Sequence, residues 1–158
     1  MQPRALVSQC LLGVPCRYDG ACAGKEDVCR EAAARGWIPV CPEILGGLCT
    51  PRTPAERQGE RVVARDGTDV TAAYRRGAEE ALRLAKLYGA RYALLKERSP
   101  SCGSGTIYDG TFTGRRVPGD GVTAGLLKAN GIEVFGETEL SEMIQRMKWD
   151  EENDTVWQ

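Results

Sequence analysis

Leu6-Val-Ser-Gln-Cys10 is a short apolar run that leads into a cysteine, and the pattern returns in Ile38-Pro-Val-Cys41 and in Leu94-Leu-Lys-Glu-Arg-Ser-Pro-Ser-Cys102. Each apolar run has the length and composition of a buried strand. If the three strands are parallel neighbours, their carboxyl ends meet at one edge of the sheet. The pattern therefore predicts that Cys10, Cys41 and Cys102, which are remote in the chain, converge on one place.

Segments with helical periodicity separate the predicted strands. Apolar residues share one face over 26–35, with Gly36 as the expected end, and they recur at spacings of three and four over 71–88, before Gly89. The remaining pattern predicts helices over 122–129 and 139–148, strands over 37–41, 61–65, 92–95 and 133–135, an irregular loop over 42–60, and a small hairpin over 107–112 around Asp109-Gly110. Strands that alternate with helices favour an α/β domain whose mainly parallel sheet has helices on both faces.

The composition fits one soluble folded unit. A chain of 158 residues is the size of an ordinary domain, and 42% hydrophobic with 27% charged residues is typical of globular proteins. We expect a single α/β domain over residues 1–148, followed by a polar C-terminal tail over residues 149–158.

Charge and apolar stretches limit the partners. The formal net charge is −1 and no long basic block occurs, so nucleic acid is not an expected partner. No stretch has the length of a membrane helix, and the N-terminus lacks the apolar run of a signal peptide. We therefore expect a cytoplasmic protein with a small-molecule partner and no membrane partner. The oligomeric state is left open, a homo-oligomer included.

Cysteine and histidine usage restricts the chemistry. Seven cysteines occur without any C-x-x-C pair, and there is no histidine. In a reducing compartment, thiols serve as metal ligands, nucleophiles or small buried residues. Without histidine, the commonest general base and the commonest zinc ligand are both missing. Any catalytic group must then be a Cys, Asp, Glu, Ser, Lys, Arg or Tyr side chain.

The convergence of Cys10, Cys41 and Cys102 predicts a soft metal centre. Three thiolates without an imidazole suit an iron-sulfur cluster. A four-iron cluster bound by only three cysteines has one open iron, which can act as a Lewis acid toward a ligand.

The other four cysteines have open roles. We expect Cys29, on the apolar face of the predicted helix over 26–35, to be a small buried residue. Cys16 and Cys22 lie in the first loop, where they are either neutral loop residues or part of an accessory site. Cys49 follows Cys41 by eight positions and is within reach of the same centre.

Glu43 and Ser101 stand next to the predicted ligands in the sequence. A carboxylate near water can accept and return a proton, which provides the acid–base function that histidine cannot. We predict that Glu43 is the proton shuttle and that Ser101 positions water or substrate. The alternative is that both side chains only cap turns.

Motifs at these same positions resemble a known family. They are Val7-Ser-Gln-Cys-Leu-Leu-Gly13, Arg17-Tyr-Asp-Gly20, Val40-Cys-Pro-Glu43 with Gly46-Gly47, Thr50-Pro-Arg52, Lys96-Glu-Arg-Ser-Pro-Ser-Cys-Gly-Ser-Gly105 and Pro118-Gly-Asp-Gly-Val-Thr123. Together they resemble the small bacterial family named domain of unknown function 523, whose members include thiouracil desulfurases of the TudS type. The resemblance covers about residues 5–136, which is most of the chain.

The resemblance implies a Rossmann-like domain in which Cys10, Cys41 and Cys102 hold a [4Fe-4S] cluster, with Glu43 and Ser101 as the catalytic pair. It implies a non-redox desulfurase: the sulfur of a thiouracil-like base binds the open iron, and water replaces that sulfur to give uracil and sulfide. Cys49 stands where the family commonly has proline, so a further or shifted ligand stays open. Cys16 and Cys22 are also departures from the family.

Two other function classes remain beside the enzyme. One is a non-catalytic iron-sulfur or sulfide carrier, which sulfide release from thiouracil would distinguish from a desulfurase. The other is a zinc-stabilised structural domain, which metal analysis and a visible absorption band would identify. The natural substrate is not determined by the sequence.

Overall fold

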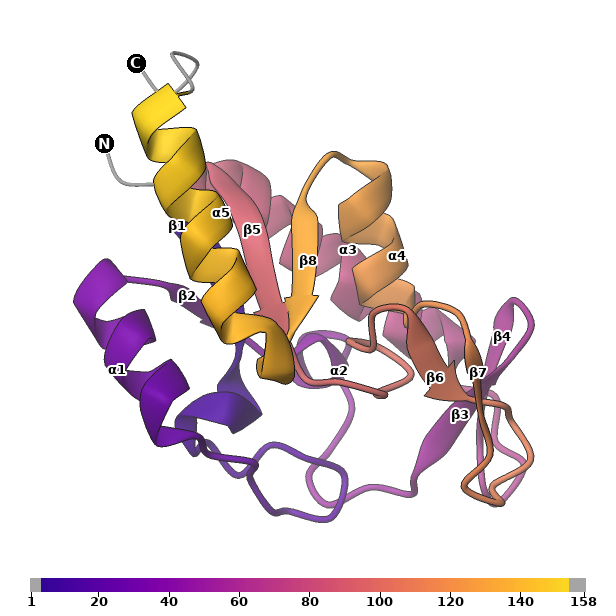
Figure 1. Ribbon diagram of the computed structural model, residues 1–158. Coiled ribbons are helices and arrows are strands. Elements are labelled where there is room, and N and C mark those ends of the chain that lie inside the picture. The colour runs from indigo at the N-terminus through magenta and orange to yellow at the C-terminus, as the bar shows by residue number, and fades with distance from the viewer. Residues whose placement is uncertain (1–3, 154–158) are drawn as a thin grey trace.

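A four-stranded parallel sheet forms the centre of the computed structural model, which describes residues 4–153 (Figure 1). In spatial order its strands are β2 (Ile38–Val40), β1 (Arg4–Ser8), β5 (Ala90–Leu95) and β8 (Glu133–Gly136). All three pairings are parallel. The prediction of an α/β fold with a parallel sheet is therefore confirmed.

The strand order reverses next to β1. The chain runs from β1 to β2 at one edge of the sheet and then returns to β5 on the other side of β1. Open parallel sheets bind ligands outside the carboxyl ends of their strands at such a reversal. The segments that follow β1 and β5 are therefore the ones that the topology brings to a ligand site.

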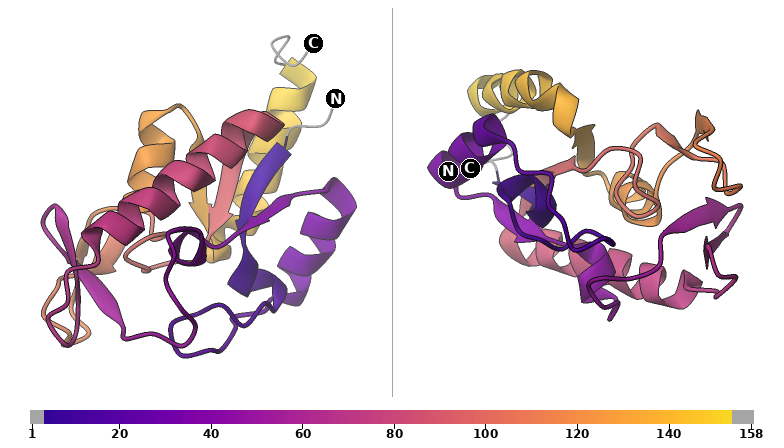
Figure 2. Two further views of the ribbon diagram at one scale, coloured as in Figure 1. Left: turned by 180° about the vertical axis from the view of Figure 1, so that it is seen from behind. Right: turned by 90° about the horizontal axis from the view of Figure 1, so that it is seen from below.

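Helices cover both faces of the sheet, as predicted. Successive residues of a strand point to opposite faces, so apolar residues in β1 pack against helices on each side. In β1, Val7 packs into the cluster that also holds buried residues of α1 (Glu26–Arg35) and α5 (Leu140–Asn153). Leu6 packs into the other cluster, with buried residues of α3 (Thr71–Tyr88) and α4 (Val122–Ala129). Figure 2 shows α5 and α3 on opposite sides of the sheet in its right-hand view.

Three helices have the predicted bounds, and one is longer. Helices α1, α3 and α4 match the sequence pattern, and Gly36 and Gly89 end α1 and α3 with left-handed φ values of 66° and 67°. Helix α5 continues to Asn153 instead of ending at Lys148. Asp150 is buried there and accepts a hydrogen bond from Tyr92, so a polar residue extends the buried face. Residues 154–158 of the predicted tail lie outside the described residues.

The predicted irregular loop over 42–60 is partly wrong. It contains the short helix α2 (Pro42–Leu45) and the strand β3 (Ala55–Gln58), which forms an antiparallel hairpin with β4 (Arg61–Ala64). Pro42 occupies the first turn of α2, where its missing N–H costs no hydrogen bond. The sequence of β3, Ala-Glu-Arg-Gln, has no apolar alternation, and none of its residues is fully buried. Its pairing is therefore not visible as a sequence period.

The second hairpin is wider than predicted. Strands β6 (Thr106–Tyr108) and β7 (Arg116–Pro118) pair antiparallel around a long loop, and Asp109-Gly110 begins that loop rather than forming the whole turn. The two hairpins lie side by side near the carboxyl edge of the sheet (Figures 1 and 2). No helix within residues 4–153 is long and apolar enough to cross a membrane.

Candidate active site

A cavity of about 370 Å³ lies at the carboxyl edge of the sheet, between the segments that follow β1, β2 and β5 and the two hairpins. Cys10, Cys41 and Cys102 all line it, and each is buried. The predicted convergence of the three thiols is therefore confirmed as geometry. It occurs next to the strand-order reversal between β1 and β5.

Local turns bring each of the three thiols to the cavity. Cys10 lies in the short 3-10 helix Gln9–Leu12 that directly follows β1. Cys41 is the residue before α2 and has an extended backbone. The segment after β5 is held by Ser99, whose hydroxyl oxygen accepts hydrogen bonds from the backbone N–H groups of Ser101 and Cys102, both at 3.1 Å.

Burial raises the pKa of two of these thiols, those of Cys10 and Cys102. Burial, and then the neighbouring Cys41, raise the pKa of Cys10 to about 11, while Lys96 and Arg17 act in the opposite direction. Burial and then Glu43 raise the pKa of Cys102, and the Ser8 hydroxyl lowers it. The mutual influence of the cysteines reflects how close they are. A bound cation would stabilise their thiolates, as metal binding does in general.

Cys16 is a fourth thiol of the cavity, and its place was left open by the sequence. It is buried and lines the cavity, and the Cys41 thiol donates to its backbone carbonyl at 3.9 Å. Burial and the neighbouring Cys41 raise the pKa of Cys16 to about 12. Because the residue belongs to no strand or helix, no periodicity could place it. The only signal was its position in the loop that follows Cys10.

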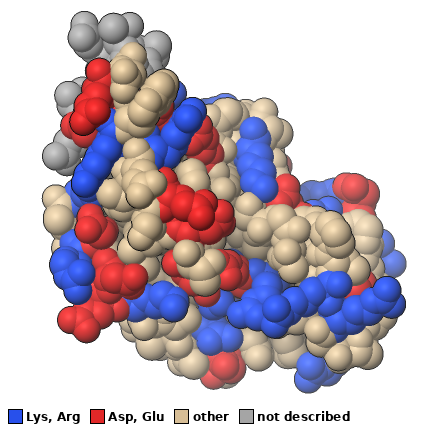
Figure 3. All heavy atoms as spheres, viewed as in Figure 1, with Lys and Arg blue, Asp and Glu red and all other residues tan. Residues whose placement is uncertain are grey.

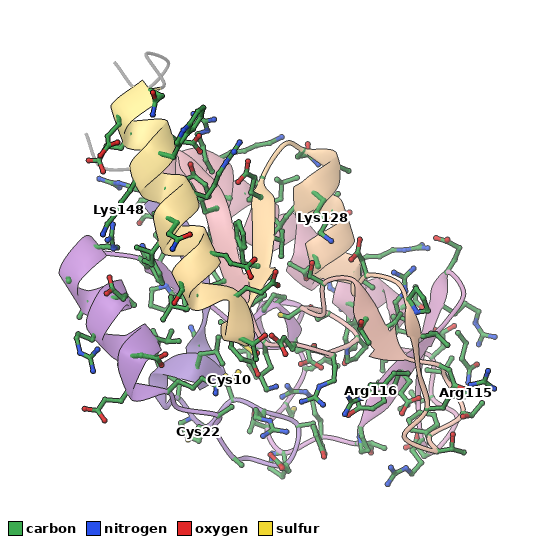
Figure 4. The ribbon with its side chains drawn as sticks, in the orientation of Figure 1. Cys10, Cys22, Arg115, Arg116, Lys128 and Lys148 are labelled. Carbon is green, nitrogen blue, oxygen red and sulfur yellow. The ribbon has the colours of Figure 1, made fainter. Side chains whose placement is uncertain are left out.

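The remaining cysteines lie elsewhere. Cys49 is exposed and does not line the cavity, and neither does the exposed Cys22. Figure 4 shows Cys10 at the end of the sheet and Cys22 on the loop beyond it. Cys29 is only partly buried and donates its thiol to the carbonyl of Leu11 at 3.8 Å.

The donor set fits a cluster with several metal atoms. Among residues 4–153, no three His, Cys, Asp or Glu side chains stand close enough together to share one metal ion. Cys10, Cys41 and Cys102 nevertheless line one cavity, and an inorganic core with several metal atoms offers each thiol a separate atom. Sulfur ligands without imidazole are also the set that iron-sulfur clusters use. The residues present therefore fit the iron-sulfur centre that the sequence predicts.

Glu43 lines the same cavity from α2, and two side chains fix its carboxylate. The hydroxyl of Tyr74, on α3, donates to Glu43 Oε1, and Arg52 Nη2 donates to Glu43 Oε2 at 3.1 Å. Burial and the Glu43 carboxylate raise the pKa of Tyr74, so its hydroxyl remains a donor. The carboxylate thus has a defined orientation next to the thiols.

Arg52 also joins its own loop to the Cys16 loop and to α2. Its Nη2 donates to the carbonyl of Cys16 at 2.9 Å, and its Nη1 donates to the carbonyl of Cys49 at 3.0 Å and to Thr50 Oγ1 at 3.1 Å. The side chain is only 8% exposed. One buried guanidinium therefore fixes the relative positions of the Cys16 loop and of Glu43.

Close packing of α2 against α3 places Glu43 beside Tyr74. A Cβ on Gly46 would collide with the carbonyl oxygen of Ala73, and a Cβ on Gly77 would collide with that of Pro42. Both positions therefore require glycine. The sequence shows these glycines, but it does not show that the two helices meet through them.

Ser101 is not brought into the cavity. It is fully buried, its Oγ lies 2.8 Å from Thr123 Oγ1 on α4, and it is not among the residues that line the cavity. Ser8 and Ser99 do line it. Ser8, at the end of β1, accepts a hydrogen bond from the backbone N–H of Lys96 and lies beside Cys102. Sequence reasoning missed Ser8, although its place before Cys10 at a strand end could have indicated it.

An ion pair fixes the segment after β5. Lys96 Nζ lies 2.8 Å from Glu137 Oε1, and Glu137 Oε2 accepts from the backbone N–H of Glu97 at 2.6 Å. The Glu97 carboxylate accepts from the backbone and hydroxyl of Thr138, and these bonds lower the pKa of Glu97 against the effect of its partial burial. Thr138 therefore fixes one oxygen of the Glu97 carboxylate, Oε1.

The outer part of the cavity is aromatic and basic. Tyr18 and Phe112 line it, and each has a guanidinium over its ring, from Arg17 at 5.9 Å and from Arg65 at 5.5 Å. Figure 3 shows basic side chains gathered over the lower part of the molecule, and Arg115 and Arg116 mark the hairpin side of this region in Figure 4. Such a surface suits a planar ligand with electron-rich atoms.

Comparisons with known proteins agree with this geometry. Residues 5–139 match the family described as 2-thiouracil desulfurase. The uncharacterized protein YbbK of Bacillus subtilis (strain 168) is 44% identical over 149 residues, which covers 88% of this chain and 99% of YbbK. The solved structure of the [4Fe-4S]-dependent thiouracil desulfidase TudS is 50% identical, with a TM-score of 0.90, and the match covers 94% of this chain and 99% of TudS.

Proposed function

The chain belongs to the 2-thiouracil desulfurase family, and we propose that it is a [4Fe-4S]-dependent desulfurase that removes the sulfur of a thiolated nucleobase such as thiouracil. The observation that carries the proposal is the cavity lined by four buried thiols, those of Cys10, Cys16, Cys41 and Cys102, and by the carboxylate of Glu43. A carrier would need the thiols but not a carboxylate fixed beside them. The oriented carboxylate beside the thiols favours an enzyme.

Cys10, Cys41 and Cys102 are the proposed ligands of the cluster. The cluster, when bound, supplies a Lewis-acidic iron without a cysteine ligand, which attracts the sulfur of the substrate. Burial raises the pKa of Cys10 and of Cys102, and Lys96 and Arg17 lower that of Cys10 against it. The Ser8 hydroxyl acts in the same direction on the pKa of Cys102. These neighbouring groups therefore offset part of the cost of burying two of the thiolates.

Glu43 is the proposed general base. Its Oε1 is held by Tyr74 and its Oε2 by Arg52, so that the carboxylate faces the cavity in one orientation. In this place it accepts a proton from the attacking water and returns one to the departing sulfur. Tyr74 and Arg52 act through Glu43, which makes them positioning residues.

Ser101 is the second proposed catalytic residue, and its hydroxyl lies 2.8 Å from that of Thr123. The Ser101 hydroxyl must turn away from Thr123 Oγ1 to reach water or substrate, because it is fully buried in its present place. Ser8 already lines the cavity. A comparison of Ser101→Ala with Ser8→Ala therefore separates a catalytic hydroxyl from a structural one.

The reaction is balanced without an oxidant or a reductant. The carbon–sulfur double bond of the substrate is replaced by a carbon–oxygen double bond from water, and the sulfur leaves as sulfide with the two protons of that water. Thiouracil therefore gives uracil and hydrogen sulfide in equal amounts. Only proton transfers are required of the protein side chains.

The test is anaerobic preparation of the whole chain, with iron and sulfide quantification followed by incubation with 2- and 4-thiouracil. We expect about four irons for each chain and the release of uracil and sulfide in a one-to-one ratio. A cluster-loaded protein that releases no sulfide above a control without enzyme would instead identify a carrier. Zinc in place of iron, without visible absorption, would identify a structural domain.

A further inference from the structure

Phe112 combines an unusual backbone with a place in the active-site cavity. Its φ is 59°, in the left-handed region that bulky side chains rarely adopt. The residue lies in the loop between β6 and β7, and its side chain lines the same cavity as the thiols and Glu43. A strained conformation at a cavity is an observation from which function can be inferred.

Side chains of the other hairpin hold this conformation. Glu56, on β3, accepts hydrogen bonds at Oε1 from the backbone N–H of Gly110 at 3.0 Å and from that of Phe112 at 3.2 Å. Gln58 Nε2 donates to the carbonyl of Gly110 at 3.0 Å. A Cβ on Gly110 would lie 2.6 Å from the carbonyl oxygen of Arg57, so the two hairpins approach each other too closely for any other residue. The position of Phe112 is therefore determined by contacts between hairpins.

The aromatic ring of Phe112 lies outside the hydrophobic core. Within residues 4–153, Phe112 belongs to neither core cluster. The Arg65 guanidinium lies 5.5 Å from the centre of its ring, and Arg65 lines the cavity as well. Packing within a core cluster therefore does not account for the position of this ring.

Three other aromatic residues line the cavity: Tyr18, Tyr74 and Tyr108. None of them has the left-handed φ of Phe112. The Tyr74 hydroxyl already donates to Glu43, and Tyr18 is 40% exposed. The observations therefore favour Phe112 as the aromatic residue that is placed for a ligand.

We infer that Phe112 is the surface on which the planar ring of the substrate stacks, and that Glu56 is the positioning residue that presents it. The inference rests on the proposed desulfurase function, because it assumes a heteroaromatic thiolated substrate. Aromatic rings attract each other in offset or edge-to-face arrangements, and bases stack on aromatic side chains irrespective of their sequence. The hairpin side of the cavity thus selects the ring, and the thiol side carries out the chemistry.

Stacking of this kind stabilises the bound substrate and the transition state to the same extent. Contacts that are equal in the ground state and in the transition state change KM but leave kcat nearly unchanged. The inference therefore makes a prediction that differs from that for Glu43, whose loss lowers kcat. This difference separates a binding residue from a catalytic one.

The experiment compares Phe112→Ala, Phe112→Leu and Phe112→Tyr with the wild-type protein, each prepared with its full cluster. We expect KM for thiouracil to rise about tenfold in the alanine and leucine variants, with kcat within about twofold, and the tyrosine variant to stay close to wild type. Equilibrium dialysis with uracil, the product, measures binding without turnover and should show the same order. The Tyr88→Ala variant, which removes an exposed aromatic residue at the end of α3, is the matched control and should change nothing.

Glu56 variants test the positioning role. Glu56→Gln keeps an acceptor oxygen for the two backbone N–H groups and should retain most of the affinity, while Glu56→Ala should raise KM as Phe112→Ala does. Wild-type KM and uracil binding in Phe112→Leu would overturn the inference, because an apolar side chain would then be sufficient. Failure of the wild-type protein to desulfurate any thiolated base refutes the proposed function instead, so the two failures are distinguishable.

Discussion

The carboxyl edge of the central sheet and the pair of hairpins form two sides of one cavity, but different interactions build them. At the sheet edge, Cys10 and Cys102 follow β1 and β5, which are buried on both faces, with Leu6, Leu94 and Leu95 fully buried, and Cys41 follows the edge strand β2. Val62 on β4 is fully buried, but within residues 4–153 no hairpin residue belongs to either core cluster. The hairpins are joined by hydrogen bonds from side chains to backbone, such as those of Glu56 to the β6–β7 loop.

This difference suggests that the sheet edge holds the reactive groups and that the hairpins recognise the ligand. Packing fixes the sheet edge, because a close-packed core resists displacement of its parts. Loops held by a few polar contacts open at lower free energy and are the usual place of ligand recognition. We therefore expect substitutions at the sheet edge to abolish function or unfold the chain, and substitutions in the hairpins to change affinity or stability by degrees.

The largest expected effect is the loss of a cluster ligand. Cys102→Ser replaces a proposed thiolate ligand by a hydroxyl that binds iron poorly, so iron content and thiouracil turnover should both fall to background. Cys49→Ser is the matched control, since Cys49 is exposed and does not line the cavity, and it should keep full iron content. Iron quantification and the visible absorption band measure the outcome.

Cys16→Ser completes the cysteine series. Because the proposed mechanism needs one iron without a cysteine ligand, the fourth thiol of the cavity should be dispensable for cluster binding. Iron content in Cys16→Ser should equal that of the wild-type protein. Loss of the cluster in this variant would mean that Cys16 is a ligand, and the requirement for an open iron would then fail.

The sequence predicted the sheet edge much better than the hairpins, and the reason is physical. Strands buried on both faces are continuous apolar runs, and α3 repeats its buried alanines at helical spacing, so both are visible as periods. Strand β3 has no fully buried residue, and it forms because β4 pairs with it. No local pattern encodes such a partner. The loop prediction over 42–60 failed for this reason.

The same contrast explains the site residues. Cys10, Cys41 and Cys102 follow strand ends, so topology alone brings them together. Cys16 reaches the cavity through a loop, and only the fold shows that it does while Cys49 does not. Short spacing along the chain is thus a poorer guide to proximity than position relative to a parallel strand.

The second largest expected effect is the removal of the proposed general base. Glu43→Gln keeps the size and the acceptor oxygen of the side chain but cannot take a proton. We expect kcat to fall by about 100- to 10,000-fold, with cluster content unchanged, since general-base catalysis contributes in this range. Glu97→Gln is the control on the same cavity, because Glu97 has no part in the proposed mechanism and the amide oxygen can still accept from Thr138, and kcat should change by less than about threefold. Equal losses in both variants would contradict a specific role for Glu43.

A smaller effect is expected from a substitution that pushes α2, which carries Glu43, away from α3. Gly77→Ala places a Cβ against the carbonyl of Pro42, so α2 must move away from α3. We expect a loss of about 1–3 kcal/mol in the free energy of unfolding from overpacking, together with a lower kcat because Glu43 moves with α2. Gly125→Ala is the same substitution in α4, where the added Cβ makes only an ordinary contact at 3.7 Å. It should stabilise the protein by about 0.5–1 kcal/mol, and urea unfolding compares the two.

The smallest expected effect concerns the exposed contacts that join the hairpin side to α3. Hydrogen bonds from the Thr71 side chain and backbone N–H, and then from Arg61 Nε, lower the pKa of Asp69 from the usual 3.8 to about 2. Because the folded-state pKa is depressed, the stabilisation is complete above about pH 4 and is lost as the pH falls toward 2. Asp69→Asn should therefore be slightly less stable than the wild-type protein at pH 6, and the difference in urea midpoint should shrink at pH 3. A difference that grows on acidification would show that the Asp69 charge opposes folding, and that the hairpin side does not depend on these polar contacts.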